Sequence, residues 1–216
     1  MTHKARRHIT PILLSLVLAI FCSNKVSAQL VIDNTMTPEE LVQNVLVGNG
    51  VSVSNVTFQG ELPQIGSFSN GESTNLNIST GVILTSGDIN DIPDQCTGIV
   101  SSNQSNLSDP DLVAISGQSI QDASILEFDF IPQSGTLSFR YVFGSEEYNS
   151  YVCCNFNDAF GFFISGPGIN GPYTNNADNI AIIPGSLPPL PVSINSVNNG
   201  TVGTNCQMNP QCTSLE

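Results

Sequence analysis

The sequence predicts a mainly β protein: an antiparallel β-sandwich or jelly-roll-like fold with one short N-terminal helix. Short runs in which apolar and polar residues alternate recur along the chain, and turn-forming stretches separate them, with 18 Gly and 13 Pro in total. Only one segment, near the N-terminus, has a helical pattern. Many short strands joined by such turns are typical of sandwiches and jelly rolls.

The first 28 residues have the pattern of a secretory signal peptide. A positively charged start is followed by a short apolar run over residues 12–21, and small residues at 26–28 form a cleavage site. The apolar run is too short to span a membrane comfortably. We expect a signal peptide over residues 1–28 and one β-domain over residues 29–216. An uncleaved anchor and a lipoprotein are the alternatives.

Loss of the signal leaves a chain with one cation. Arg140 is then the only Lys or Arg against 18 Asp and Glu, so the side-chain charge is −17, and no His, Lys or Trp remains. His-dependent nucleophilic catalysis, His-ligated zinc and lysine Schiff bases are excluded. So negative a chain repels phosphate backbones, and we expect no nucleic-acid partner. It attracts cations, and Ca²⁺ is the extracellular ion that prefers carboxylate and carbonyl oxygens.

Five cysteines remain after residue 28, which is an odd number. Export favours disulfides, so one thiol stays free or pairs outside the chain. Cys153 and Cys154 are adjacent, and a bond between them would strain the peptide that joins them. We expect them to have different partners, or one of them to remain a buried apolar residue.

The helix is predicted to begin at Thr37 as N-cap, with Pro38 in the first position and Glu40 completing a capping box, and to end at Gly48. Strands are predicted from apolar alternation or from short apolar runs. The expected strands cover residues 51–58, 81–85, 124–131, 136–143, 160–165, 179–183 and 192–197. Residues 60–75 and 87–111 are expected to be loops, and 112–120 is ambiguous.

Residues 124–131 and 136–143 are expected to form a hairpin around a four-residue turn. If Ile131 pairs with Thr136, Glu127 lies opposite Arg140 on the same face, and we predict an ion pair there. The run 160–165 is apolar on both faces, which predicts a central strand. The expected aromatic core consists of Phe128, Phe130, Phe139, Phe143, Phe160, Phe162 and Phe163.

The stretch 139–168 concentrates aromatic residues, the cysteine pair and an acidic doublet. Carboxylates with an amide and backbone carbonyls are how irregular Ca²⁺ sites are built, so a Ca²⁺ site is expected at Glu146, Glu147, Asn157 and Asp158. The alternative is that one Glu caps backbone N–H groups and the others face water. The aspartates of the long polar loop are expected to be mostly solvated: Asp88, Asp91, Asp94, Asp109 and Asp111.

An enzyme is not expected. A glycosidase needs two carboxylates facing each other across a cleft, and adjacent Glu146 and Glu147 would point to opposite faces of a strand. Tyr148, Tyr151 and Tyr173 could stack on sugars, or pack at a wet rim, which Tyr tolerates.

Several blocks of the chain, in order, resemble the choice-of-anchor L domain, a family of secreted bacterial surface domains. The resemblance covers nearly all of residues 33–206 and rests on TPEELVQNVLVGNGVSVSN, QIGSFSNG, GVILTSGDI, DPDL, ASILEFDF, FRYVFGSEEY, FNDAFGFFISGPGI, NIAIIPG and PVSINSVNNG. It implies an exported or cell-surface bacterial β-module, often part of a larger adhesin-like protein, with no defined enzymatic activity. Members continue with more strands, so the domain is expected to be C-terminally incomplete, and Cys154 stands where the family has a small polar residue.

The sequence therefore favours a secreted or surface-displayed module for adhesion or extracellular binding, stabilised by Ca²⁺. Its expected partner is an extracellular protein or glycan, and membrane association is expected only through an anchor that is not visible in the sequence. The alternatives are a carbohydrate-active enzyme or accessory sugar-binding module, and a structural spacer in a larger surface protein.

Overall fold

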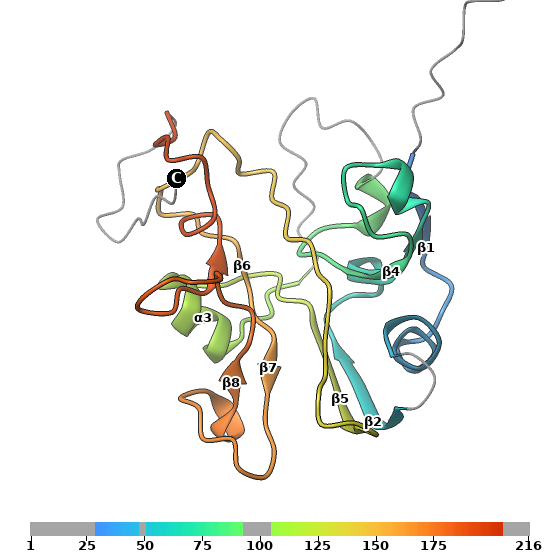
Figure 1. Ribbon diagram of the computed structural model, residues 1–216. Helices are drawn as coiled ribbons and strands as arrows, with labels where there is room; N and C mark the ends of the chain where they lie inside the picture. The colour runs from blue at the N-terminus through green and yellow to red at the C-terminus, as the bar shows by residue number, and fades with distance from the viewer. Residues whose placement is uncertain (1–28, 48–50, 93–104, 205–216) are drawn as a thin grey trace, which may run out of the picture.

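The computed structural model describes residues 29–47, 51–92 and 105–204. In these residues the fold is mainly β, in small antiparallel sheets with few helices, which confirms the predicted class. Figure 1 shows two halves side by side, with β1, β2, β4 and β5 in one and α3 and β6 to β8 in the other. Residues 139–168, the stretch with the aromatic residues, the cysteine pair and the acidic doublet, run from one half to the other.

The first half contains a three-stranded sheet in the order β1-β3-β4. Its strands are β1 (Val31–Asp33), β3 (Ile65–Ser69) and β4 (Gly81–Leu84). The prediction of a loop over residues 60–75 is wrong, because β3 is the central strand. Gly66 lies there, where a Cβ would meet Ile89 Cδ1 at 2.5 Å and the Asp33 carbonyl at 2.7 Å. The close approach of neighbouring segments explains why so polar a sequence forms a buried strand.

The predicted helix begins where the sequence indicates. It consists of α2 (Pro38–Glu40), which continues as the wider η2 (Leu41–Leu46). The capping box is formed, because the Glu40 N–H donates to Thr37 Oγ1 at 3.2 Å and the Thr37 N–H donates to the Glu40 carboxylate at 2.9 Å. Leu41 and Val42 are fully buried against the sheet.

A two-stranded ribbon pairs β2 (Ser52–Gln59) with β5 (Ile125–Ile131). Both strands were predicted, but the predicted hairpin is wrong, since β5 pairs with β2 and residues 136–143 form no ladder. The Glu127–Arg140 ion pair is therefore not formed. Glu127 accepts from Gln59 Nε2 at 3.3 Å, and the Arg140 guanidinium donates to the Asn77 carbonyl at 2.7 Å.

The second half contains two short ribbons. One pairs β6 (Ala159–Phe160) with β9 (Val192–Ser193), and the other pairs β7 (Phe163–Ile164) with β8 (Asp178–Asn179). The predicted strands at 160–165, 179–183 and 192–197 are thus present only in part. The ambiguous region forms α3 (Pro110–Ser116), and the remaining helical turns are η3 (Leu62–Gln64), η4 (Gly71–Ser73), η5 (Ile89–Asp91) and η6 (Thr174–Asn176).

The expected Phe core is wrong in detail. All seven of those Phe are partly exposed. The largest fully buried side chains are instead Leu41, Val42, Gln64, Ile89, Val152, Cys153, Cys154 and Ile194. The rings pack in small groups instead, Phe128 with Phe130 and Phe139 with Phe162. A cavity of about 220 Å³ lies between η2, β5 and residues 137–139.

Gln64 is a buried amide in the first half. Its Oε1 accepts from the Glu61 N–H at 2.7 Å, and its Nε2 donates to the carbonyls of Asp122 at 2.8 Å and Ser86 at 3.2 Å. We expect Gln64→Ala to lower the free energy of unfolding by about 2–4 kcal/mol, because it leaves buried backbone groups unpaired. Urea denaturation measures the change. The control is Gln59→Ala on the exposed face of β2, which should cost less than about 1 kcal/mol, and equal losses would contradict this role of Gln64.

Candidate functional site

The acid loop, residues 144–158, connects the extended segment 137–143 to β6. Its base is closed by Ser145, whose hydroxyl donates to Asp158 Oδ2 at 2.6 Å. The same hydroxyl oxygen accepts from the Glu147 N–H at 3.0 Å. One serine therefore holds Asp158 at the end of the loop next to the backbone that carries the acidic doublet.

Glu146, Glu147 and Asp158 lie within electrostatic reach of one another. Burial raises the pKa of the Glu147 carboxyl, and the neighbouring charges of Asp158 and Glu146 raise it further. Glu147 Oε2 is buried and accepts no hydrogen bond from any described residue. This carboxylate is thus held in a place that disfavours its charge and lacks a compensating donor.

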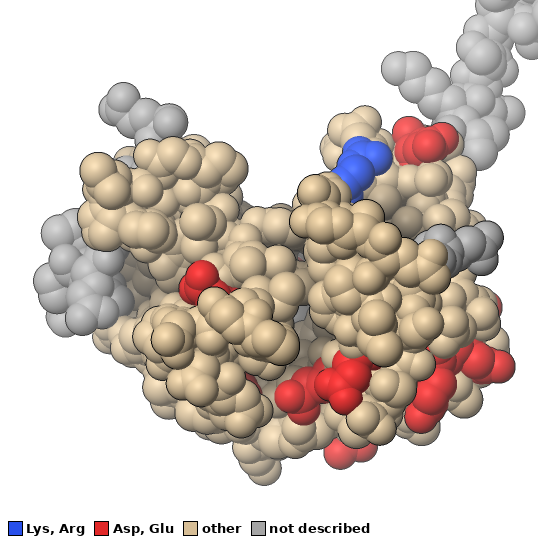
Figure 2. Space-filling model, turned by 60° about the horizontal axis from the view of Figure 1, so that its bottom comes forward, with Lys and Arg blue, Asp and Glu red and all other residues tan. Residues whose placement is uncertain are grey.

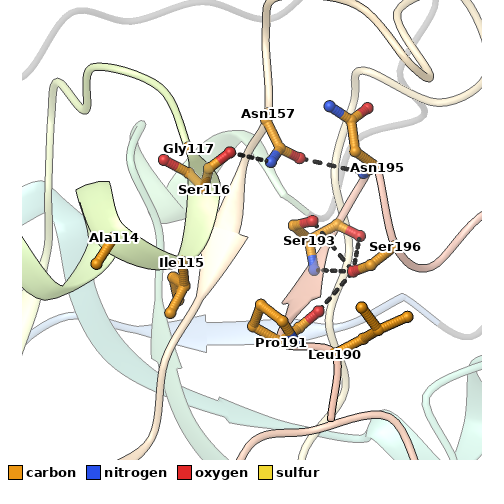
Figure 3. A pocket seen from close by; sticks show the side chains of 10 residues that line it. All are labelled: Ala114, Ile115, Ser116, Gly117, Asn157, Leu190, Pro191, Ser193, Asn195 and Ser196. Carbon is orange, nitrogen blue, oxygen red and sulfur yellow. Dashed lines mark hydrogen bonds between the residues drawn. The ribbon is translucent and has the colours of Figure 1, made fainter. Parts of the chain in front are cut away.

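Asn157 does not join these carboxylates. Its Nδ2 donates to the Ser116 carbonyl at the end of α3, at 2.7 Å, and its Oδ1 accepts from the Asn195 N–H at 3.1 Å. Figure 3 shows this side chain bridging the two segments beside a cavity of about 170 Å³. Of the four expected ligands, Glu146 and Asp158 each act electrostatically on Glu147, whereas Asn157 has a structural role.

Asn195 fixes the cysteine pair and was not predicted. Its Oδ1 accepts from the Cys153 N–H at 2.7 Å, and its Nδ2 donates to the Cys154 carbonyl at 3.3 Å. Cys153 has a positive φ of 66°, which the Asn195 amide supports. Both cysteines are buried and disulfide-bonded. No local sequence pattern marks Asn195, because its partners lie about 40 residues away along the chain.

The tyrosines pack mainly as rim residues. Tyr173 contacts the ring of Phe163 with centroids 4.9 Å apart, and the Tyr148 hydroxyl donates to the Val197 carbonyl. Tyr151 makes an edge-on contact with Phe156 at 5.6 Å. Phe156 itself is 57% exposed, so the acid loop presents an aromatic ring to solvent.

Three aspartates of the predicted long loop have local structural roles. Asp88 caps η5, and Asp109 caps α3 by accepting from the Asp111 and Leu112 N–H groups at 2.9 and 2.8 Å. Asp111 accepts from the Thr174 N–H and hydroxyl. Asp94 lies outside the described residues.

Charge on the described surface is almost entirely negative. Figure 2 shows carboxylates spread over the face in view and one small basic patch. Within residues 29–47, 51–92 and 105–204, no three His, Cys, Asp or Glu side chains are arranged to hold a metal ion by themselves. A cation at the acid loop would therefore take part of its coordination from backbone carbonyls or water.

Comparison with known proteins identifies the family of this domain. The sequence profile of the choice-of-anchor L domain matches residues 29–214. The chain belongs to the choice-of-anchor L domain family. No curated protein and no solved structure matches the chain.

A choice-of-anchor L domain is a module of bacterial cell-surface or extracellular proteins, and the family is not a known enzyme family. In the part of this choice-of-anchor L domain that the structure describes, no helix is long and apolar enough to cross a membrane. The family matches almost the whole of the described chain, so the acid loop lies inside the family domain.

The bridge made by Asn157 gives a first prediction for this site. Asn157→Ala removes both bonds that join α3 to the segment around Asn195, and we expect it to lower the free energy of unfolding by about 1–3 kcal/mol. Asn155→Ala is the matched control, because Asn155 is exposed on the same loop and should change stability by less than about 0.5 kcal/mol. Chemical denaturation of both variants measures the difference, and equal stabilities would contradict the bridge.

The raised pKa of Glu147 gives a prediction for pH. Below the ordinary value of 4.5 the carboxyl is protonated in both the folded and the unfolded chain. As pH rises above that value the unfolded chain loses its proton first, so this group lowers the free energy of unfolding until pH passes the raised folded pKa. We expect Glu147→Gln to remove this loss, so that its stability advantage over wild type grows from pH 4 to neutral pH.

Thermal unfolding across this pH range tests the expectation. Glu72→Gln is the control, because Glu72 is exposed on η4 and its variant should follow the wild-type pH profile. A Glu147→Gln profile that runs parallel to wild type throughout would show that the buried carboxyl carries no such penalty.

Proposed function

We propose that this choice-of-anchor L domain is an exported surface module that binds an extracellular protein or glycan through its acid loop and is stabilised there by Ca²⁺. Three features of the chain support export: the charged start, the short apolar run and the small-residue cleavage site. The family match begins at residue 29, directly after that cleavage site. Export also suits a chain whose buried cysteines are disulfide-bonded.

The observation that carries the Ca²⁺ proposal is the state of Glu147. Its buried oxygen has no donor among the described residues, and two further carboxylates lie close enough to raise its pKa. A divalent cation would reverse this, because it favours the charged form of Glu147 and screens Glu146 and Asp158 from it. Glu146, Glu147 and Asp158 are the proposed ligands, with backbone carbonyls and water completing the shell.

The exposed ring of Phe156 supports the binding role. An aromatic surface flanked by carboxylates can contact a sugar ring or a basic, partly apolar peptide. A glycan array separates these partners, because a sugar-binding accessory module would retain defined glycans and a protein-binding module would not. A structural spacer would bind neither glycans nor extracellular proteins.

Differential scanning calorimetry tests the Ca²⁺ proposal. For a dissociation constant in the range of about 10⁻⁴–10⁻³ M, typical of extracellular modules, about 5 mM Ca²⁺ stabilises the folded state by about 1–2 kcal/mol. We expect the melting temperature of the full chain to be about 2–8 °C higher in Ca²⁺ than in EDTA. Glu147→Gln and Asp158→Asn should each remove most of this difference.

The matched control is Glu72→Gln, which removes a carboxylate far from the acid loop in sequence and should keep the full Ca²⁺ effect. A wild-type melting temperature that is the same in Ca²⁺ and EDTA would remove the Ca²⁺ proposal. An effect that survives in Glu147→Gln and Asp158→Asn would place the ion elsewhere.

A further inference from the structure

The strap, residues 137–143, is an extended segment whose backbone groups are not hydrogen-bonded. Its N–H and C=O groups make no hydrogen bond with any described residue. Its sequence alternates like a strand, and in Figure 1 it runs beside β5 at the junction of the two halves. Five of its seven residues are exposed, so the strap presents a row of unpaired N–H and C=O groups that can pair with another strand.

The facing edge, at Ala159, Gly161 and Phe163, also has free backbone groups. The Asp158 and Phe162 carbonyls accept from the Ile194 and Ile180 N–H groups, at 3.1 and 2.8 Å. Successive residues of an extended chain direct their backbone groups to opposite edges. Ala159, Gly161 and Phe163 therefore direct their backbone groups away from β8 and β9.

The side chains of the strap already lie in a strand register with this edge. The rings of Phe139 and Phe162 have centroids 4.5 Å apart, and those of Tyr141 and Phe160 are 5.1 Å apart. From Phe139 to Tyr141 the strap advances by two residues, and from Phe162 to Phe160 the facing edge goes back by two. This is the relation between neighbours in an antiparallel pair of strands. These ring contacts match cross-strand neighbours on one face of a sheet.

We propose that the strap closes onto the facing edge as an antiparallel strand, with Phe139 opposite Phe162 and Tyr141 opposite Phe160. Phe162 uses its own backbone groups on the β8 side, so the bonded pairs are Ser138 with Phe163, Arg140 with Gly161, and Val142 with Ala159. Closure joins the strap to β6 and β7 in one ladder. The protein thus has an open form, which the structure shows, and a closed form.

Closure also acts on the acid loop, because the loop joins the strap to β6. In the closed register residue 143 lies opposite Asp158, so the new ladder adds to the Ser145–Asp158 hydrogen bond that already closes the base of the loop, and it fixes the positions of the carboxylates more firmly. A cation bound there would favour the closed form. This coupling rests on the proposed Ca²⁺ site, whereas closure itself does not.

Residue-resolved hydrogen exchange of the full chain tests the closure. We expect the amides of Ser138, Arg140 and Val142 to exchange at least about 100-fold more slowly than unstructured amides. Val142→Pro removes the donor of the last bonded pair and should return Ser138 and Arg140 to fast exchange, while β2 and β5 stay protected. Val142→Ala is the matched control and should keep the protection, because Val142 is exposed and its side chain makes no hydrogen bond.

Two results would overturn the closure: unstructured exchange rates at all three amides in wild type, or protection that survives Val142→Pro. The coupling between Ca²⁺ binding and closure is measured separately: Ca²⁺ should slow hydrogen exchange of the same amides further. If Ca²⁺ raises the melting temperature and leaves these amides unchanged, the Ca²⁺ site stands and the coupling fails. If the amides are protected and Ca²⁺ has no thermal effect, closure stands alone.

Discussion

Side-chain amides hold this fold together where other proteins use ion pairs. With Arg140 as the one cation after residue 28, the carboxylates cannot be paired with opposite charges. Amides satisfy the buried backbone instead. Asn179 Oδ1 accepts from the Phe162 and Ala181 N–H groups, each at 3.0 Å, while Asn195 and Gln64 bind backbone groups far away in sequence. Because an amide donates and accepts at once, it can bridge two segments without introducing a buried charge.

This reliance on amides decides how much the sequence could predict. The capping box at Thr37 and the strands β2, β4 and β5 follow from local patterns, and all are present. The central strand β3 escaped prediction, because Gly66 and Ser67 look like a loop until neighbouring segments pack on them. The pairing of β5 with β2 also escaped it, since a turn in the sequence favoured a hairpin and only long-range packing selects the distant partner.

In the acid loop, too, some features could be predicted from the sequence and others could not. An acidic loop between two apolar runs could be predicted from the sequence, and Glu146 and Asp158 do act on Glu147 there. The role of Asn157 could not, because an amide next to Asp158 has the chemistry of a ligand and of a bridge alike. The deciding contacts are the Ser116 carbonyl and the Asn195 N–H, which come from opposite sides of the loop in sequence. The burial of Glu147 Oε2 likewise depends on tertiary packing.

The carboxylates without a cation, in the acid loop, and the backbone without hydrogen bonds, in the strap, are neighbours along the chain. In the proposal, the strap on β6 fixes the base of the acid loop, which the Ser145–Asp158 hydrogen bond already closes, and so holds Glu146 and Asp158 near Glu147, whose pKa they raise. Backbone bonds favour closure, and the repulsion among carboxylates held in fixed positions opposes it. A ligand shifts such a balance only by its differential affinity for the two forms, and a cation has that difference if the closed form holds its ligands in place. The same scarcity of positive charge that makes the fold depend on amides therefore leaves its binding loop responsive to a cation from outside.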